Sequence, residues 1–292
     1  MPSFKADHTD NGKRVDLYLS KKMPGFSRSS LKGLFLAKQV TIAGEVIKPS
    51  YKLKTDDNLR VSTRLLNVKP KVIKLPLVYE DGDVLVINKP SGVLTHSKGA
   101  INLEATVASS LRSKVDPELS GNRAGIVHRL DRATSGLLLL AKNKSSHEFL
   151  QRQFANRKVK KQYLAVAEGV PSLSEASIDV PIARNPNKPQ TFMASAAGKN
   201  AVTNYQLKQT ITQGDTTYSL LALQPETGRT HQIRVHLKYI NHPVVGDRIY
   251  GHEGDHMLLH ASQLSVTTPS KKTMTFTAPL PDYFYSFGVK KT

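Results

Sequence analysis

The chain has 292 residues, no cysteine, and 42 Lys and Arg against 23 Asp and Glu, a formal net charge of +19. Without cysteine, disulfides, thiolate–metal sites and a cysteine nucleophile are excluded, and a reducing cytoplasm is the expected location. The basic excess favours a polyanionic partner, either a nucleic acid or an anionic membrane. No apolar run approaches the ~20 residues that span a bilayer, and MPSFKADHTDNGKR lacks the apolar region of a secretory signal. We therefore expect a nucleic acid as the partner and no membrane.

The amino-terminal quarter carries over half of the excess charge, since residues 1–74 hold sixteen Lys and Arg against six Asp and Glu. Apolar spacing in RVDLYLSKKM and SRSSLKGLFLAK predicts two short helices, and residues 39–61 then alternate like small strands. Arg28 and Lys32 lie off the apolar face at the start of the second helix, where the helix dipole also favours phosphate. These two side chains are the predicted phosphate contacts of this region.

The stretches RVDLYLS, FSRSSLKGL and VTIAGEVIKPSYKLK, between Arg14 and Val61, resemble the RNA-binding domain shared with the small-subunit ribosomal protein S-four family. The resemblance implies a small α/β RNA-binding domain at residues 1–65; a generic basic cap is the alternative. Residues 66–76 contain two prolines and several lysines, which predicts an extended linker before a second, larger domain at 77–292.

Residues 77–292 predict an α+β domain with a mixed, largely antiparallel sheet and flanking helices. LVYEDGDVLVINKP has an Asp-Gly turn between two β-rich runs, typical of a hairpin. SSHEFLQRQFAN reads as a helix, whereas GLLLLAKN, QYLAVAEG and YSLLALQP read as strands. The strands and helices do not alternate regularly, so a doubly wound parallel sheet is not expected.

The segment GIVHRLDRATSGLLLLAKN, residues 125–143, places a polar cluster directly before a fully apolar strand. The strand predicts a buried anchor, with the polar cluster on a loop at its mouth. Asp131 lies between Arg129 and Arg132, and nearby cations favour the ionised form that a nucleophile or general base requires. On composition alone, a surface ion pair remains the alternative.

This segment closely resembles the signature of the RluA-type pseudouridine synthases, and the similarity extends over nearly the whole chain. The resemblance implies that Asp131 is catalytic and that Arg129 occupies the gap left by a flipped base. VKKQYLAVAEG resembles the tyrosine motif of that family, which implies that Tyr163 packs against the flipped uracil. PETGRTHQIRVHLKYINHPVVGD resembles a further motif and implies that Arg229 pairs with Asp131. The alternatives are a core aromatic at Tyr163 and an RNA-phosphate contact at Arg229.

In the last of these motifs, Thr230 is the expected cap of a helix whose buried stripe includes Ile233 and Leu237. His231 and Arg234 are expected on the opposite face. Arg234 is therefore a predicted RNA contact, as are His128 and Arg132 from the polar cluster before the apolar strand.

The string from His252 to His256 reads H-E-x-x-H, a zinc-protease motif when it lies on a helix. Gly254 and Asp255 are poor helix interiors, so we expect a polar loop and no metal site. The chemistry implied by the resemblance requires no cofactor and no obligate protein partner. Large-subunit ribosomal RNA is the expected target, with tRNA as the alternative; a non-catalytic RNA-binding or ribosome-assembly protein is the rival function.

Overall fold

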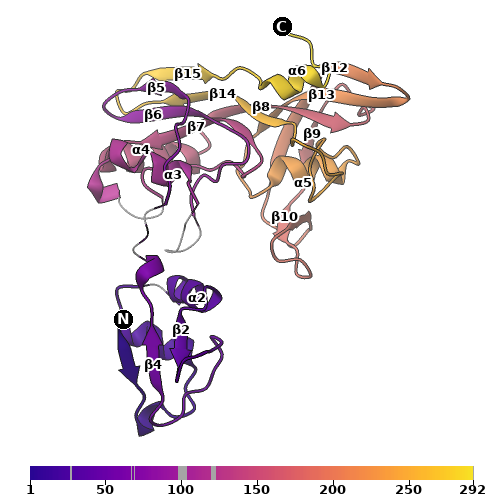
Figure 1. The fold of residues 1–292 in the computed structure, drawn as a ribbon. Helices are drawn as coiled ribbons and strands as arrows, with labels where there is room; N and C mark the ends of the chain where they lie inside the picture. The colour runs from indigo at the N-terminus through magenta and orange to yellow at the C-terminus, as the bar shows by residue number, and fades with distance from the viewer. Residues whose placement is uncertain (27, 67, 69, 98–103, 120–122, 292) are drawn as a thin grey trace. The chain divides into compact units, whose positions relative to one another are not determined.

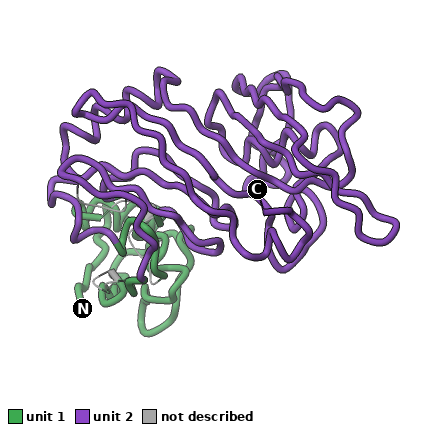
Figure 2. Tube along the Cα trace, turned by 90° about the horizontal axis from the view of Figure 1, so that it is seen from above, with its two compact units in different colours: residues 1–73, 96–110, 121–123 green, residues 74–95, 111–120, 124–292 purple. Residues whose placement is uncertain are grey.

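The structure is a computed structural model that describes residues 1–26, 28–66, 68, 70–97, 104–119 and 123–291. Contacts divide the chain into two compact units, coloured separately in Figure 2. The amino-terminal unit comprises residues 1–73, 96–110 and 121–123, and the larger unit comprises the remainder. The predicted boundaries differ from this division, because they placed residues 96–110 in the larger domain. Of the predicted linker, residues 67 and 69 lie outside the described residues.

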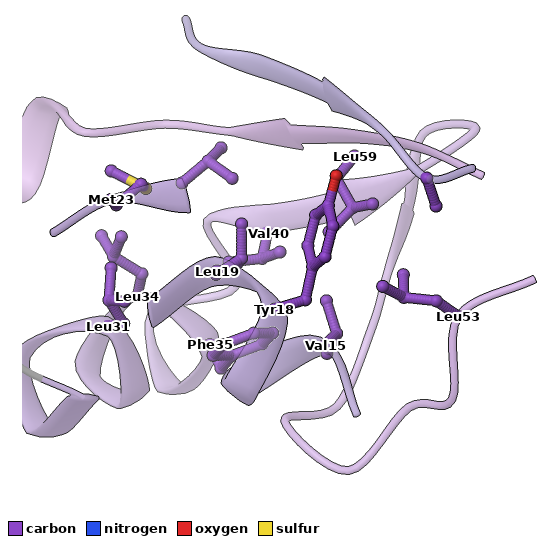
Figure 3. Packing of buried hydrophobic residues seen from close by; sticks show 12 residues of the cluster. Val15, Tyr18, Leu19, Met23, Leu31, Leu34, Phe35, Val40, Leu53 and Leu59 are labelled. Atoms are coloured by element: carbon purple, nitrogen blue, oxygen red, sulfur yellow. The ribbon is translucent and has the colours of Figure 1, made fainter. Parts of the chain in front are cut away.

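The amino-terminal unit packs two helices against a four-stranded antiparallel sheet of order β1-β4-β2-β3. Its elements are β1 (Ser3–Lys5), α1 (Val15–Lys22), α2 (Arg28–Leu36), β2 (Val40–Ile42), β3 (Glu45–Val46) and β4 (Asn58–Val61). The apolar residues that predicted the two helices, among them Leu19, Leu31 and Leu34, are fully buried in one cluster (Figure 3). A short helix, α3 (Val107–Ser110), belongs to the same unit.

The larger unit is built on a nine-stranded sheet whose pairs are antiparallel except for β7 with β14. Along the path of the sheet the order is β5 (Leu77–Glu80), β6 (Val84–Lys89), β7 (Ser135–Ala141), β14 (Leu259–Thr267), β8 (Lys160–Glu168), β13 (Thr216–Pro225), β12 (Val202–Gln213) and β9 (Glu175–Asp179), with β15 (Thr273–Thr277) paired to β14. The predicted mixed, largely antiparallel α+β fold is confirmed, as is the first hairpin.

Three helices and a hairpin complete the larger unit. The helices are α4 (Lys144–Ala155), α5 (Gln232–Tyr239) and α6 (Asp282–Ser286), and the hairpin pairs β10 (Ile182–Arg184) with β11 (Phe192–Ala194). Figure 1 shows α4 and α5 on the same side of the sheet. Within the described part of the chain, no helix is long and apolar enough to cross a bilayer.

The central strand β7 carries the predicted apolar run, and every one of its residues is buried. It meets β14 in a short parallel pairing, in which Ser135 lies opposite His260 and Gly136 opposite Ala261. Gly136 has a φ of +110°, and a Cβ there would lie 2.3 Å from the carbonyl oxygen of Ala261. Glycine is therefore required where the loop that carries Asp131 enters the sheet.

Candidate active site

The loop before β7 is hydrogen-bonded to the segment that follows β6. Thr95 Oγ1 donates a hydrogen bond to the Leu130 carbonyl at 2.8 Å, and the Gly92 amide donates to the Arg132 carbonyl at the same distance. Asp131 lies between these two hydrogen-bonded residues, so its backbone has little conformational freedom.

A fully buried lysine adds further hydrogen bonds between these two segments. Lys89 Nζ donates to the carbonyls of Pro90 and Val93, each at 2.9 Å, and to that of Arg132 at 3.2 Å. Burial lowers the pKa of Lys89 to about 7, while the charge of Asp131 acts in the opposite direction. The lysine thus connects the segment after β6 with the loop that carries Asp131.

The carboxylate of Asp131 is the outer member of a row of three charges. Its Oδ2 accepts a hydrogen bond from Arg234 Nη1 at 3.0 Å, and its side chain is only 15% exposed. Arg234 in turn donates Nε and Nη2 to the two oxygens of buried Asp247, at 2.6 and 2.7 Å. Burial alone would lower the pKa of Arg234, but Asp247 and then Asp131 raise it above its ordinary value. A permanent cation between two carboxylates is the result.

The structure does not form the predicted pair of Arg229 with Asp131. Arg229 is exposed, and its Nε donates to the Asn200 carbonyl at 3.0 Å. It lies in the turn before α5, whereas Arg234 lies on the first turn of that helix. Arg234 is accordingly buried, not on an exposed face as predicted.

The start of α5 differs from the prediction in a second way. The cap residue is His231, in the left-handed region with a φ of 57°, rather than Thr230. Gln232 Oε1 accepts hydrogen bonds from the Arg229 amide at 2.9 Å and from Thr227 Oγ1 at 2.6 Å. A buried glutamine side chain thus supports the turn before the helix.

Asp131 opens into a pocket of about 470 Å³, a size typical of small-molecule sites. Its walls come from the loop before β7, the end of α4, β8, the turn after β13, and α5. Tyr163, on β8, lines this pocket and also packs in the core cluster that contains Ala165. Burial raises the pKa of Tyr163, so its hydroxyl stays protonated at neutral pH. Tyr163 therefore belongs both to the core and to the pocket wall.

Lys161 is a pocket residue that the sequence reasoning missed. It precedes Tyr163 by two residues in β8, so the two side chains share a face of the strand. Its Nζ donates to the Thr227 carbonyl at 3.0 Å, and burial lowers the pKa of Lys161 to about 8. The alternation of side chains along the strand, counted back from Tyr163, could have indicated Lys161.

Of the other RNA contacts predicted in this unit, two line the pocket and one does not. Arg129 is exposed and lines the pocket. His128 also lines the pocket, but its Nε2 accepts a hydrogen bond from the Leu139 amide at 2.9 Å. Burial lowers the pKa of His128 to about 3. His128 is therefore neutral and fixed within the fold. Arg132 is exposed, and its Nη1 donates to the Gly92 carbonyl at 3.3 Å.

In the amino-terminal unit, Arg28 and Lys32 are both exposed on α2. Arg28 Nη2 donates to Asp16 Oδ2 at 2.7 Å, and Arg14 Nε donates to the other oxygen of the same carboxylate at 3.0 Å. These hydrogen bonds, Arg14 first, lower the pKa of Asp16 to about 2, although burial opposes them.

The H-E-x-x-H string forms the predicted loop and not a helix. His252 Nδ1 lies 2.9 Å from Glu168 Oε2, and the ring of His256 stacks on Tyr283 with centroids 4.3 Å apart. Across the residues that the structure describes, no group of three or more His, Cys, Asp or Glu side chains could hold a metal ion.

Comparisons with known proteins agree on one family. The family model described as RNA pseudouridylate synthase matches residues 83–239. An uncharacterized RNA pseudouridine synthase of Bacillus subtilis, YlyB, is 36% identical and covers 95% of this chain and 93% of its own length. The ribosomal large subunit pseudouridine synthase D of Escherichia coli K12 is 35% identical, covering 92% of this chain and 88% of its own length.

A solved structure supports the same assignment. Human RNA pseudouridylate synthase domain containing 1 superposes with a TM-score of 0.59 at 32% identity, covering 70% of this chain and 83% of its own. Together with the family match over more than half of the chain, these relatives show that the protein belongs to the RNA pseudouridine synthases, isomerases that act on RNA.

Proposed function

We propose that this enzyme isomerises specific uridines of large-subunit ribosomal RNA to pseudouridine, with Asp131 as its catalytic carboxylate. The observation that carries the proposal is the position of Asp131, at the edge of a pocket and paired with the buried Arg234. The choice of RNA is supported by the relatives named ribosomal large subunit pseudouridine synthase D.

In the proposed reaction the target nucleotide leaves its stack and enters the pocket, where the uracil lies against Tyr163. Arg129, exposed at the rim, occupies the gap left in the RNA. Asp131 initiates cleavage of the bond between N1 of the base and C1′ of the sugar. The base then turns and rejoins through C5, the proton on C5 is lost, and N1 gains a proton. The product is an isomer of the substrate, so no oxidant or group donor is consumed.

Substrate binding is proposed to extend to the amino-terminal unit, as an RNA-binding domain of the ribosomal S-four type. Its support is the exposed cation group of Arg14, Arg28 and Lys32, together with over half of the excess positive charge in residues 1–74. Phosphate contacts of this kind position an RNA without reading its sequence.

The test of the catalytic assignment is Asp131→Asn, which keeps the size of the side chain but removes its charge. We expect no detectable release of tritium from C5-labelled uridine in cognate RNA, with RNA affinity unchanged, because one carboxylate contributes nothing to phosphate contacts. Asp215→Asn, at the exposed turn between β12 and β13, is the matched control and should keep full activity. Substantial release by the Asp131 variant would refute the assignment.

The target is tested separately by deleting the gene and mapping pseudouridines with carbodiimide and primer extension. Loss of one or more sites in large-subunit ribosomal RNA is expected, with restoration by the wild-type gene but not by Asp131→Asn. If pseudouridines were lost only from tRNA, tRNA would replace ribosomal RNA as the proposed substrate, and the catalytic proposal would stay intact.

A further inference from the structure

One tyrosine outside the pocket lining contacts two pocket residues, His231 and Arg234, and also the strand β11. The Tyr250 hydroxyl accepts a hydrogen bond from the Phe192 amide of β11 at 2.9 Å and lies 2.8 Å from His231 Nδ1. The Tyr250 ring lies over the Arg234 guanidinium, whose Cζ is 5.0 Å from the ring centroid. The same turn supplies Asp247, whose Oδ1 also accepts the Tyr250 amide at 3.3 Å.

The partners of the His231 ring indicate which of its nitrogens carries the proton. The Phe192 amide can only donate, so it uses a lone pair of the Tyr250 oxygen. On the other side of the ring, His231 Nε2 faces the Asp131 carboxylate, which only accepts, so we assign the ring proton to Nε2 and the Tyr250 hydroxyl as the donor to Nδ1. Burial lowers the pKa of His231, which keeps its ring neutral although Asp131 opposes this effect. In the neutral ring the proton then resides on Nε2.

His231 Nε2 lies 3.7 Å from Asp131 Oδ2, the oxygen that also accepts Arg234 Nη1. At this distance the imidazole makes an electrostatic contact rather than a full hydrogen bond, and such contacts often shorten when substrate binds. Both donors therefore face Oδ2. No described residue donates a hydrogen bond to Oδ1, which leaves that oxygen for the substrate.

We propose that Tyr250 is a positioning residue: its hydroxyl holds His231 with Nε2–H toward Asp131, and its ring holds Arg234 in place. One side chain thereby sets both donors on the reacting carboxylate. The Phe192 amide makes this arrangement depend on the β10–β11 hairpin, and the Phe192 ring also meets the His231 ring edge-on, with centroids 5.5 Å apart. This inference rests on the proposed catalytic role of Asp131.

The experiment measures single-turnover pseudouridine formation at saturating enzyme, RNA affinity, and the thermal midpoint of each variant. Tyr250→Phe removes the hydroxyl and keeps the ring over Arg234, so we expect a rate about 10-fold lower from misorientation alone. RNA affinity and the thermal midpoint should change no more than in Tyr205→Phe. That control loses a hydroxyl bonded to the Leu173 carbonyl at 3.3 Å, away from the pocket.

Two substitutions of His231 test whether the hydroxyl acts through the imidazole. His231→Asn tolerates the left-handed backbone but cannot reach Asp131, so it should lose rate like Tyr250→Phe, and the double variant should be no slower than either. His231→Gln places an amide N–H near the position of Nε2, so Tyr250→Phe should have little further effect in that background.

The outcomes separate this inference from the proposed function. A normal rate in Tyr250→Phe beside an inactive Asp131→Asn would overturn the positioning role and leave the catalytic carboxylate in place. Additive losses in the double variant would also overturn it, as would a rate loss matched by weaker RNA binding. Activity in Asp131→Asn would instead refute the proposed function itself.

Discussion

The protein contains two clusters of aspartate and arginine with opposite arrangements. In the larger unit, buried Arg234 lies between Asp131 and Asp247, so the cluster carries a net charge of −1. In the amino-terminal unit, Asp16 lies between Arg14 and Arg28, so that cluster carries a net charge of +1. The arginines there are about half exposed, whereas the Arg234 side chain is 5% exposed.

The difference shows how the same residue types serve different tasks. A buried cation with two anionic neighbours stabilises a carboxylate at the edge of a pocket, where it can act on a substrate. A carboxylate with two exposed arginines instead holds their planar guanidinium groups at the surface, in a geometry that would suit the phosphate contacts proposed above. Burial, rather than composition, determines which member of each cluster is presented to the ligand.

The largest effect is expected from Arg234→Met, which keeps the length of the side chain but removes its charge. Asp247 would remain buried without a cation, and breaking such a pair costs about 3–5 kcal/mol of stability. Activity should also be lost, because Asp131 loses its partner. Chemical denaturation and tritium release measure the two losses.

A second substitution distinguishes those two losses. In Arg234→Met with Asp247→Asn, the buried unpaired charge is gone, so part of the stability should return. Activity should not return, since Asp131 still lacks a cation. Recovery of activity together with stability would mean that Arg234 serves the fold alone.

The next effect is in the amino-terminal cluster, where we expect affinity to change without chemistry. If Arg14→Gln with Arg28→Gln removes two phosphate contacts, the slope of log affinity against log salt should become shallower by about 1.5. The single-turnover rate of bound RNA should be unchanged. Lys271→Gln with Lys272→Gln, at an exposed turn of the larger unit, removes the same charge and is the control. An identical slope in both double variants would contradict a specific role for the cluster.

The loop that carries Asp131 could be predicted from sequence because its features are local. A polar cluster next to a fully apolar strand predicts a loop at the mouth of a buried strand, and β7 confirms that reading. The partner of Asp131 could not be predicted in the same way. Arg229 and Arg234 both flank the start of α5, and the choice depends on Asp247, which lies 13 residues beyond Arg234 in a separate turn.

Buried lysines were the other feature that the sequence did not reveal. Lys89 directly precedes a proline, and three backbone carbonyls surround its Nζ in the core. Two of these carbonyls belong to the turn directly after Lys89 and the third to Arg132, in a distant segment. Backbone carbonyls leave no periodic pattern in the sequence, so only the assembled fold shows this site.

A smaller effect concerns the stability of the amino-terminal unit in acid. The folded-state pKa of Asp16, about 2, lies below its ordinary value of 3.8, so its contribution to stability is present above pH 3.8 and is lost as pH falls toward 2. Because both arginines are exposed, the contribution is on the order of 1 kcal/mol. Native-state hydrogen exchange of α1 and α2 should show this loss in the wild type between pH 4 and pH 2, and Asp16→Asn should not show it.

The smallest effect is expected from Arg229→Gln, the arginine that sequence similarity assigns to Asp131. In the structure its Nε bonds the Asn200 carbonyl, and Arg234 already supplies the cation for the carboxylate. The variant should therefore keep its single-turnover rate within about 3-fold, while RNA affinity falls modestly through one lost phosphate contact. Arg234→Gln, measured in the same assay, should be inactive. If the two variants lost rate equally, Arg229 would have to move to Asp131 when RNA binds, and the contrast between the exposed and the buried arginine would no longer describe the working enzyme.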